Sequence, residues 1–141
     1  MIRAYYTSKL VPTGDGSGNF SVDLWENVRR SRFVVETMEQ SFDPKLLVFA
    51  PHRHEMLIRL WERDELSSGE IAMFNTQIIN LCDILIVDSD PSDSSEVTMD
   101  VQFAIDNRLD VCYTYQHTNL DDKFKQLDEV IRNFKDESNK I

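Results

Sequence analysis

Residues 81–104 read LCDILIVDSDPSDSSEVTMDVQFA and combine a short apolar run, a polar loop and an amphipathic segment, in that order. The run Ile84–Val87 is apolar throughout and rich in β-branched residues, as is typical of a strand covered on both faces. The six residues after it are all Asp, Ser or Pro, which favour a turn. Val97, Val101 and Ala104 then follow at helical spacing. This succession predicts a parallel sheet, in which ligands bind beyond the carboxyl ends of the strands.

The same alternation continues on both sides of this stretch. We expect further strands over Ile2–Thr7, Leu46–Ala50 and Val111–Tyr115. Helices are expected over about 21–40, 55–63, 97–105 and 120–134. A further helix is expected to begin at the Ser-x-x-Glu capping box at 67–70. The sequence therefore predicts a three-layer α/β sandwich of flavodoxin or Rossmann type, with a mainly parallel sheet of four or five strands. We expect one domain over residues 1–135, followed by a frayed tail over 136–141.

Composition narrows the classes of partner. The chain has 141 residues and a formal net charge of −10, which disfavours binding to duplex nucleic acid but not to a small anion in a basic pocket. Cys82 and Cys112 lie in or beside apolar runs, as free thiols do in a reduced, cytoplasmic protein. The longest apolar run, Leu46–Ala50, is far too short to span a bilayer, so no membrane partner is expected.

Three polar strand ends are expected to converge on one edge of the sheet. They are Tyr6-Thr7-Ser8, His52-Arg53-His54 and Asp88-Ser89-Asp90. A cleft at this edge would hold both acidic and basic groups, with Asp100 contributed by the opening turns of the following helix. Ser94 and Ser95 are helix N-cap candidates. Their hydroxyls and backbone amides could instead donate hydrogen bonds to a phosphate, which Arg53 would also contact.

Metal and cofactor sites are not expected. The closely spaced His52, His54 and Glu55 lack further ligands, since His117 is the one remaining histidine. Residues 15–26 place oxygen-bearing side chains at the spacing of a calcium loop but lack its central glycine, so we favour a mobile lid there. No phosphate-binding glycine motif or dinucleotide fingerprint occurs, and no cofactor is predicted.

Residues 1–116 resemble the nucleoside 2-deoxyribosyltransferase superfamily, including its deoxynucleotide N-glycosidase relatives. The resemblance rests on three segments, which are YYTS at 5–8, NLCDI at 80–84 and above all SSEVTMDVQFA at 94–104. It implies a glutamate nucleophile at the position of Asp100 and a second carboxylate at the position of Asn75. It also implies assembly as a homo-oligomer.

The resemblance implies a protein that binds a nucleoside or nucleotide and cleaves or transfers its N-glycosidic bond through a carboxylate nucleophile. Asp100 would attack the sugar, Asn75 and Asp88 would orient it, and Tyr6 and Thr7 would line the base or sugar pocket. Because Asn75 cannot transfer a proton at neutral pH, a non-catalytic protein that senses or sequesters a nucleotide signal in the same cleft is the alternative. A protein that binds a partner through its acidic surface is a third possibility.

Overall fold

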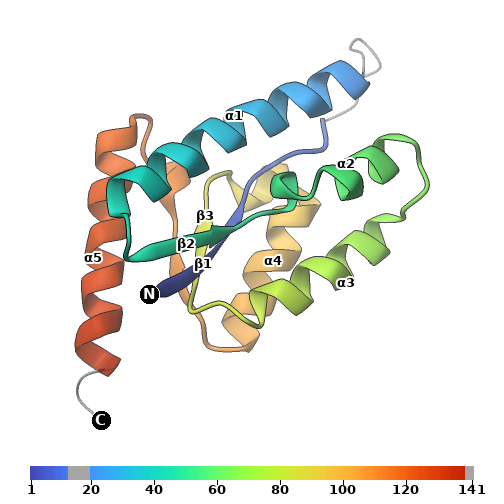
Figure 1. Cartoon of the computed structure of the whole chain (residues 1–141). Coiled ribbons are helices and arrows are strands. Elements are labelled where there is room, and N and C mark those ends of the chain that lie inside the picture. Colours follow the sequence, from blue (N-terminus) through green and yellow to red (C-terminus); the bar gives the residue numbers. More distant parts are fainter. Residues whose placement is uncertain (13–19, 139–141) are drawn as a thin grey trace.

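Four strands form one sheet in the computed structural model, which describes residues 1–12 and 20–138 (Figure 1). The strands are β1 (Ile2–Thr7), β2 (Leu46–Phe49), β3 (Ile84–Val87) and β4 (Asp110–Cys112). Their order across the sheet is β2-β1-β3-β4, and each neighbouring pair is parallel. The carboxyl ends of β1 and β3, the two central strands, therefore lie side by side.

Helices cover both faces of the sheet. They are α1 (Phe20–Phe42), α2 (Glu55–Glu62), α3 (Ser68–Ile79), α4 (Ser95–Asp106) and α5 (Leu120–Ser138), with single 3₁₀ turns η1 (Pro51–Arg53), η2 (Pro91–Asp93) and η3 (Thr114–Gln116). Helices α1 and α5 pack on one face, and α3 and α4 pack on the other (Figure 1). The three-layer α/β fold of Rossmann type is thus confirmed.

The alternation of side chains along β1 divides the core into two halves. Ala4 and Tyr6 pack with Val35, Met38, Leu127 and Ile131 from α1 and α5, whereas Tyr5 packs with Ile79, Val97 and Val101 from α3 and α4. Successive residues of a strand point to opposite faces, so this division is a direct consequence of the extended backbone. It also means that polar groups at the end of β1 are distributed over both faces.

Several boundaries differ from the sequence expectation. Strand β4 ends at Cys112, and Thr114–Gln116 forms a 3₁₀ turn in place of the predicted strand end. The apolar residues Leu81 and Ile105 are 59% and 53% exposed, because Leu81 follows the end of α3 and Ile105 lies on the outer face of α4. Helix α5 continues to Ser138, so the first residues of the predicted tail are helical.

Both helix N-caps that the sequence predicts, at Ser67 and Ser94, are present in the structure. The Ser67 hydroxyl accepts a hydrogen bond from the Glu70 amide, and the Glu70 side chain accepts one from the Ser67 amide, which completes the predicted capping box. Ser94 caps α4 by accepting a hydrogen bond from the Val97 amide at 3.4 Å. Each cap satisfies an amide that the helix itself leaves unpaired.

The described part of the chain contains no helix long and apolar enough to cross a membrane. Cys82 and Cys112 are free and buried, and burial raises the pKa of their thiols to about 11 and about 12. Much of the predicted glycine-rich lid and of the calcium-like pattern falls on residues 13–19, which lie outside the described residues.

Candidate functional site

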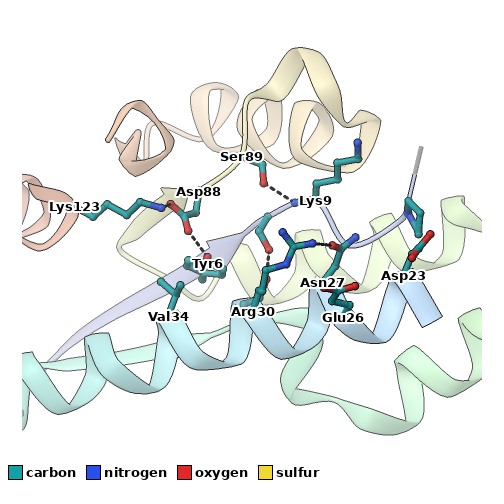
Figure 2. Close-up of a pocket in the computed structure, with 13 residues that line it drawn as sticks. Tyr6, Lys9, Asp23, Glu26, Asn27, Arg30, Val34, Asp88, Ser89 and Lys123 are labelled. Atoms are coloured by element: carbon teal, nitrogen blue, oxygen red, sulfur yellow. Dashed lines mark hydrogen bonds and ion pairs between the residues drawn. The ribbon is translucent and has the colours of Figure 1, made fainter. Parts of the chain in front are cut away.

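A cavity of about 620 Å³ opens at the carboxyl ends of β1 and β3, on the face covered by α1 and α5 (Figure 2). Its lining is mostly polar and comes from β1, α1, α5 and the segments that follow the two strands. The lining residues are Tyr6, Ser8, Lys9, Pro12, Asp23, Glu26, Asn27, Arg30, Ser31, Val34, Asp88, Ser89 and Lys123. Parallel α/β proteins place their ligands at this edge of the sheet, so this cavity is the leading candidate site.

Asp88 organises one end of the cavity. It follows β3 directly, and its backbone amide donates to the Thr7 carbonyl at 2.9 Å, which fixes it beside β1. Its carboxylate accepts hydrogen bonds from the Tyr6 hydroxyl at 2.5 Å and the Thr114 hydroxyl at 2.8 Å, and pairs with the Lys123 ammonium at 2.7 Å. Both oxygens are therefore already engaged. Through these contacts Asp88 holds Tyr6 and Lys123 in place.

Burial strengthens this network. The Asp88 and Lys123 side chains are 6% and 14% exposed, so little water competes for their charges. Burial, with the neighbouring Asp88 charge as the second cause, raises the pKa of Tyr6 well above its usual 10.0. The Tyr6 phenol thus stays protonated and donates to Asp88.

The segment after β1 forms one wall of the cavity and is tied down at several points. The Lys9 amide donates to the Ser89 hydroxyl at 2.9 Å, and the Asn27 side-chain amide donates to the Leu10 carbonyl at 2.9 Å. The Ser8 and Ser31 hydroxyls are hydrogen-bonded at 2.7 Å. Leu10 is 2% exposed and packs among residues of α1, α2 and α3, so this wall is part of the core.

Asp100 lies on the opposite face of the sheet end. Its carboxylate accepts a hydrogen bond from the Thr7 hydroxyl at 2.7 Å, and the residue is 3% exposed. Burial raises the Asp100 pKa from 3.8 to about 7, although the Thr7 hydrogen bond opposes the rise. One turn earlier on α4, burial likewise raises the Glu96 pKa from 4.5 to about 7, while the Val11 amide donates to Glu96 at 3.4 Å. The two carboxylates therefore titrate near neutral pH.

Four side chains among the described residues have buried polar atoms without a hydrogen-bond partner. These atoms are the Tyr5 hydroxyl, the carbonyl oxygens of Asn75 and Gln126, and both ring nitrogens of His52. Asn75 and His52 are 4% and 1% exposed. Burial lowers the His52 pKa from 6.5 to about 4, so its ring is neutral at pH 7, and it packs edge-on against Tyr6 with ring centres 6.1 Å apart.

The structure separates the residues expected around one cleft. Tyr6, Ser8 and Asp88 line the cavity, but Thr7, His52 and Asp100 do not. Adjacent residues of a strand face opposite ways, so Thr7 turns toward α4 while Tyr6 turns toward α1. Asp88 and Asp100 thus contact side chains on opposite faces of β1.

The residues expected to contact a phosphate, Arg53, Ser94 and Ser95, do not line this cavity either. Arg53 pairs with Glu39 at 2.5 Å, away from the cavity, because η1 carries it toward α1. Ser94 is buried as the cap of α4, and Ser95 begins that helix on its exposed side, so neither lines the cavity. Within the described residues, no group of three or more His, Cys, Asp or Glu side chains is placed to hold a metal ion.

Sequence reasoning missed the basic residues that do line the cavity. Lys9, Arg30 and Lys123 come from three separate segments. The available signal was only that Arg30 lies off the apolar stripe of α1. Lys123 had no such signal, because its place depends on how α5 packs.

Comparisons of the chain with family models, with curated proteins and with solved structures find no match. The resemblance to nucleoside 2-deoxyribosyltransferases therefore stays a prediction, and the function is argued from the site.

Proposed function

We propose that the protein binds a nucleoside or nucleotide-like ligand in the cavity at the carboxyl ends of β1 and β3. The observation that carries the proposal is this cavity of about 620 Å³, one end of which holds the Tyr6–Asp88–Lys123 network. Its volume lies in the range of about 300–1,000 Å³ that is usual for small-molecule sites. Hydroxyl, amide and charged groups around it suit a ligand with many hydrogen-bonding atoms.

Cleavage of the N-glycosidic bond is the catalytic form of this proposal. The Asp100 carboxylate would attack the anomeric carbon of the sugar, and the base would leave with the electrons of the broken bond. Burial raises the Asp100 pKa to about 7, so the ionised, nucleophilic form of this carboxyl is accessible near neutral pH. The Thr7 hydroxyl donates to Oδ2 of this carboxylate, so Oδ1 is the oxygen that would attack the sugar.

Binding without turnover is the second candidate, and the burial of Asp100 favours it. Asp100 is 3% exposed and does not line the cavity. Asn75, at the position of the family's second carboxylate, is buried and cannot deliver a proton. The cavity therefore supports ligand binding more directly than it supports cleavage.

A thermal-shift panel of nucleosides and of nucleoside mono- and diphosphates tests the binding proposal. A ligand at about 100 times its dissociation constant adds about 2.7 kcal/mol of stability, which raises the melting temperature by about 5–10 °C. Ser89→Phe, which fills the cavity from its lining, should abolish the shift. Ser92→Phe, on the same loop but exposed and outside the lining, should retain it. A panel that produces no shift would refute the proposal.

Release of free base separates the two candidates. Incubation of the protein with each stabilising ligand, followed by chromatography, detects the base. If the protein is catalytic, Asp100→Asn should abolish release while leaving the thermal shift intact, since the amide keeps the shape but not the nucleophile. Asn75→Asp should raise the rate in a catalytic protein and change only the affinity in a binding protein.

A further inference from the structure

We propose that Glu96 of α4 is the proton donor and acceptor that works beside Asp100 in cleavage of the N-glycosidic bond. This inference rests on the catalytic form of the proposed function, because it supplies the proton that Asn75 cannot give. Glu96 is not a residue to which the resemblance gives a role.

Glu96 and Asp100 lie one turn apart on the side of α4 that faces the end of β1. The Thr7 hydroxyl donates to Asp100 at 2.7 Å, and the Val11 amide donates to Glu96 at 3.4 Å. Residues four apart on a helix have Cβ atoms about 5–6 Å apart. Glycosidases that retain configuration hold their two carboxyl groups about 5–5.5 Å apart, so this spacing suits a nucleophile and its proton donor.

The Tyr5 hydroxyl marks a polar space beside both carboxyls. It is buried and has no hydrogen-bond partner among the described residues. Burial raises the Tyr5 pKa well above its usual 10.0. The nearby Asp100, Cys82 and Glu96 add to this rise, so the hydroxyl lies close to both carboxyls. A sugar oxygen held beside them would give this hydroxyl the partner that it lacks.

The surroundings of the two carboxyls favour a single proton on the pair at neutral pH. Burial raises both pKa values to about 7. At Glu96 the Asp100 charge adds to the rise, whereas the Val11 amide and the Lys9 charge oppose it. Two neighbouring carboxyls shielded from water resist being ionised together. The state with Asp100 ionised and Glu96 protonated is therefore accessible near pH 7, and it is the state that cleavage requires.

Glu96 stands at the border of the cavity and within reach of water. Lys9, whose charge acts on Glu96, lines the cavity, and its side chain points away from α1 (Figure 2). Val11, which donates to Glu96, belongs to the same segment after β1. Glu96 is partly exposed, whereas Asp100 is 3% exposed. Glu96 can therefore exchange protons with water, as a group that gives up a proton in every turnover must.

Cleavage by this pair proceeds in two balanced steps. In the first, Oδ1 of Asp100 forms a bond to the anomeric carbon while the carbon–nitrogen bond breaks, and the base leaves with the electrons of that bond and the Glu96 proton. In the second, water attacks the same carbon and gives a proton to Glu96, and the electrons of the ester bond return to Asp100. The free sugar leaves, and both carboxyls regain their starting states.

Two classes of substrate separate this role from a structural one. A nucleobase needs a proton to leave, whereas nitrophenolate is a stable anion that leaves without one. The probes are the common nucleosides, their 5′-monophosphates, and the 4-nitrophenyl glycosides of ribose and 2-deoxyribose. Glu96→Gln keeps an oxygen for the Val11 amide, and Asp106→Asn is the control, because Asp106 is an exposed carboxylate on the same helix. A melting curve shows that each variant is folded.

Glu96→Gln should slow release of the base by about 10²- to 10⁴-fold, the usual contribution of a proton donor. With a nitrophenyl glycoside it should release about one nitrophenol per protein in a fast burst and then turn over slowly, because water is no longer activated and the glycosyl ester accumulates. Mass spectrometry should detect this ester. Asp100→Asn should show no burst, and Asp106→Asn should behave as the wild type does.

The pH profile gives a second readout. Wild-type release of the base should fall as pH rises above 7, because Glu96 then loses the proton that the base needs. Glu96→Gln should lack this fall, since the amide does not titrate.

Undiminished release of the base by Glu96→Gln would overturn the inference. An equal loss on both classes of substrate, without a burst, would also overturn it, because it would mark a structural role. Both results leave Asp100 as the proposed nucleophile. Absence of release from every probe by the wild type would refute this inference together with cleavage, while ligand binding in the cavity would still stand on the thermal-shift panel.

Discussion

Replacement of Asp100 by asparagine should stabilise the protein above neutral pH. The folded chain holds the Asp100 pKa at about 7 instead of 3.8, because burial disfavours the charged form. This difference corresponds to about 4 kcal/mol that the fold loses when Asp100 ionises. The asparagine amide has nearly the same shape and keeps an oxygen for the Thr7 hydroxyl, but it carries no charge.

The sign of the pH dependence follows from proton binding. Between pH 4 and pH 7 the folded chain holds the Asp100 proton more tightly than the unfolded chain does, so this group lowers the free energy of unfolding as pH rises through that range. The variant lacks this titration. The advantage of Asp100→Asn over the wild type should therefore grow by about 3 kcal/mol between pH 5 and pH 8.

Urea denaturation followed by tryptophan fluorescence at pH 5 and pH 8 measures this difference. Asp106→Asn is the control, since Asp106 lies on the same helix, is exposed and bonds only to the Gln102 side chain among the described residues. It removes one carboxylate of the same helix from an exposed position, and so controls for the loss of a negative charge. If Asp100→Asn were destabilising by the same amount at both pH values, Asp100 would be ionised and stabilising in the fold, and the argument from burial would be wrong.

Three further predictions test the surrounding structure. His52→Phe should remove a loss of stability that the wild-type protein shows on acidification. The folded His52 pKa of about 4 lies below the usual 6.5, so protonation of this group lowers the wild-type free energy of unfolding by about 3 kcal/mol as pH drops from 7 to 4. Urea titrations across that pH range measure the loss. Asp88→Asn should cost about 3–5 kcal/mol in the same assay, because it leaves the Lys123 ammonium without its partner, and addition of Lys123→Met should recover most of that loss. Ser67→Ala should cost about 1 kcal/mol by removing the cap of α3, measured as a lower melting temperature, whereas a neutral result would show that the capping box contributes nothing to stability.

The arrangement of strands and helices could be predicted from local sequence patterns. The apolar run at β3, the capping box at Ser67 and the stripe that buries Leu127 and Ile131 on α5 each reflect a period set by backbone geometry. Asp88 was predicted at the site for the same reason, since a residue that directly follows a central parallel strand must emerge at the carboxyl edge. These features depend on neighbours within a few positions along the chain.

The composition of the cavity was decided by tertiary packing. Tyr6 and Thr7 are adjacent in sequence, yet the pleat of β1 and the helices on each face send one to the cavity and the other to Asp100. Arg30 and Lys123 reach the same cavity from α1 and α5 because those helices share one face of the sheet. Sequence periodicity determined that each helix has a buried side. Which face it covers, and which polar residues then meet at its border, depends on contacts between segments far apart in the chain, and these have no local signature.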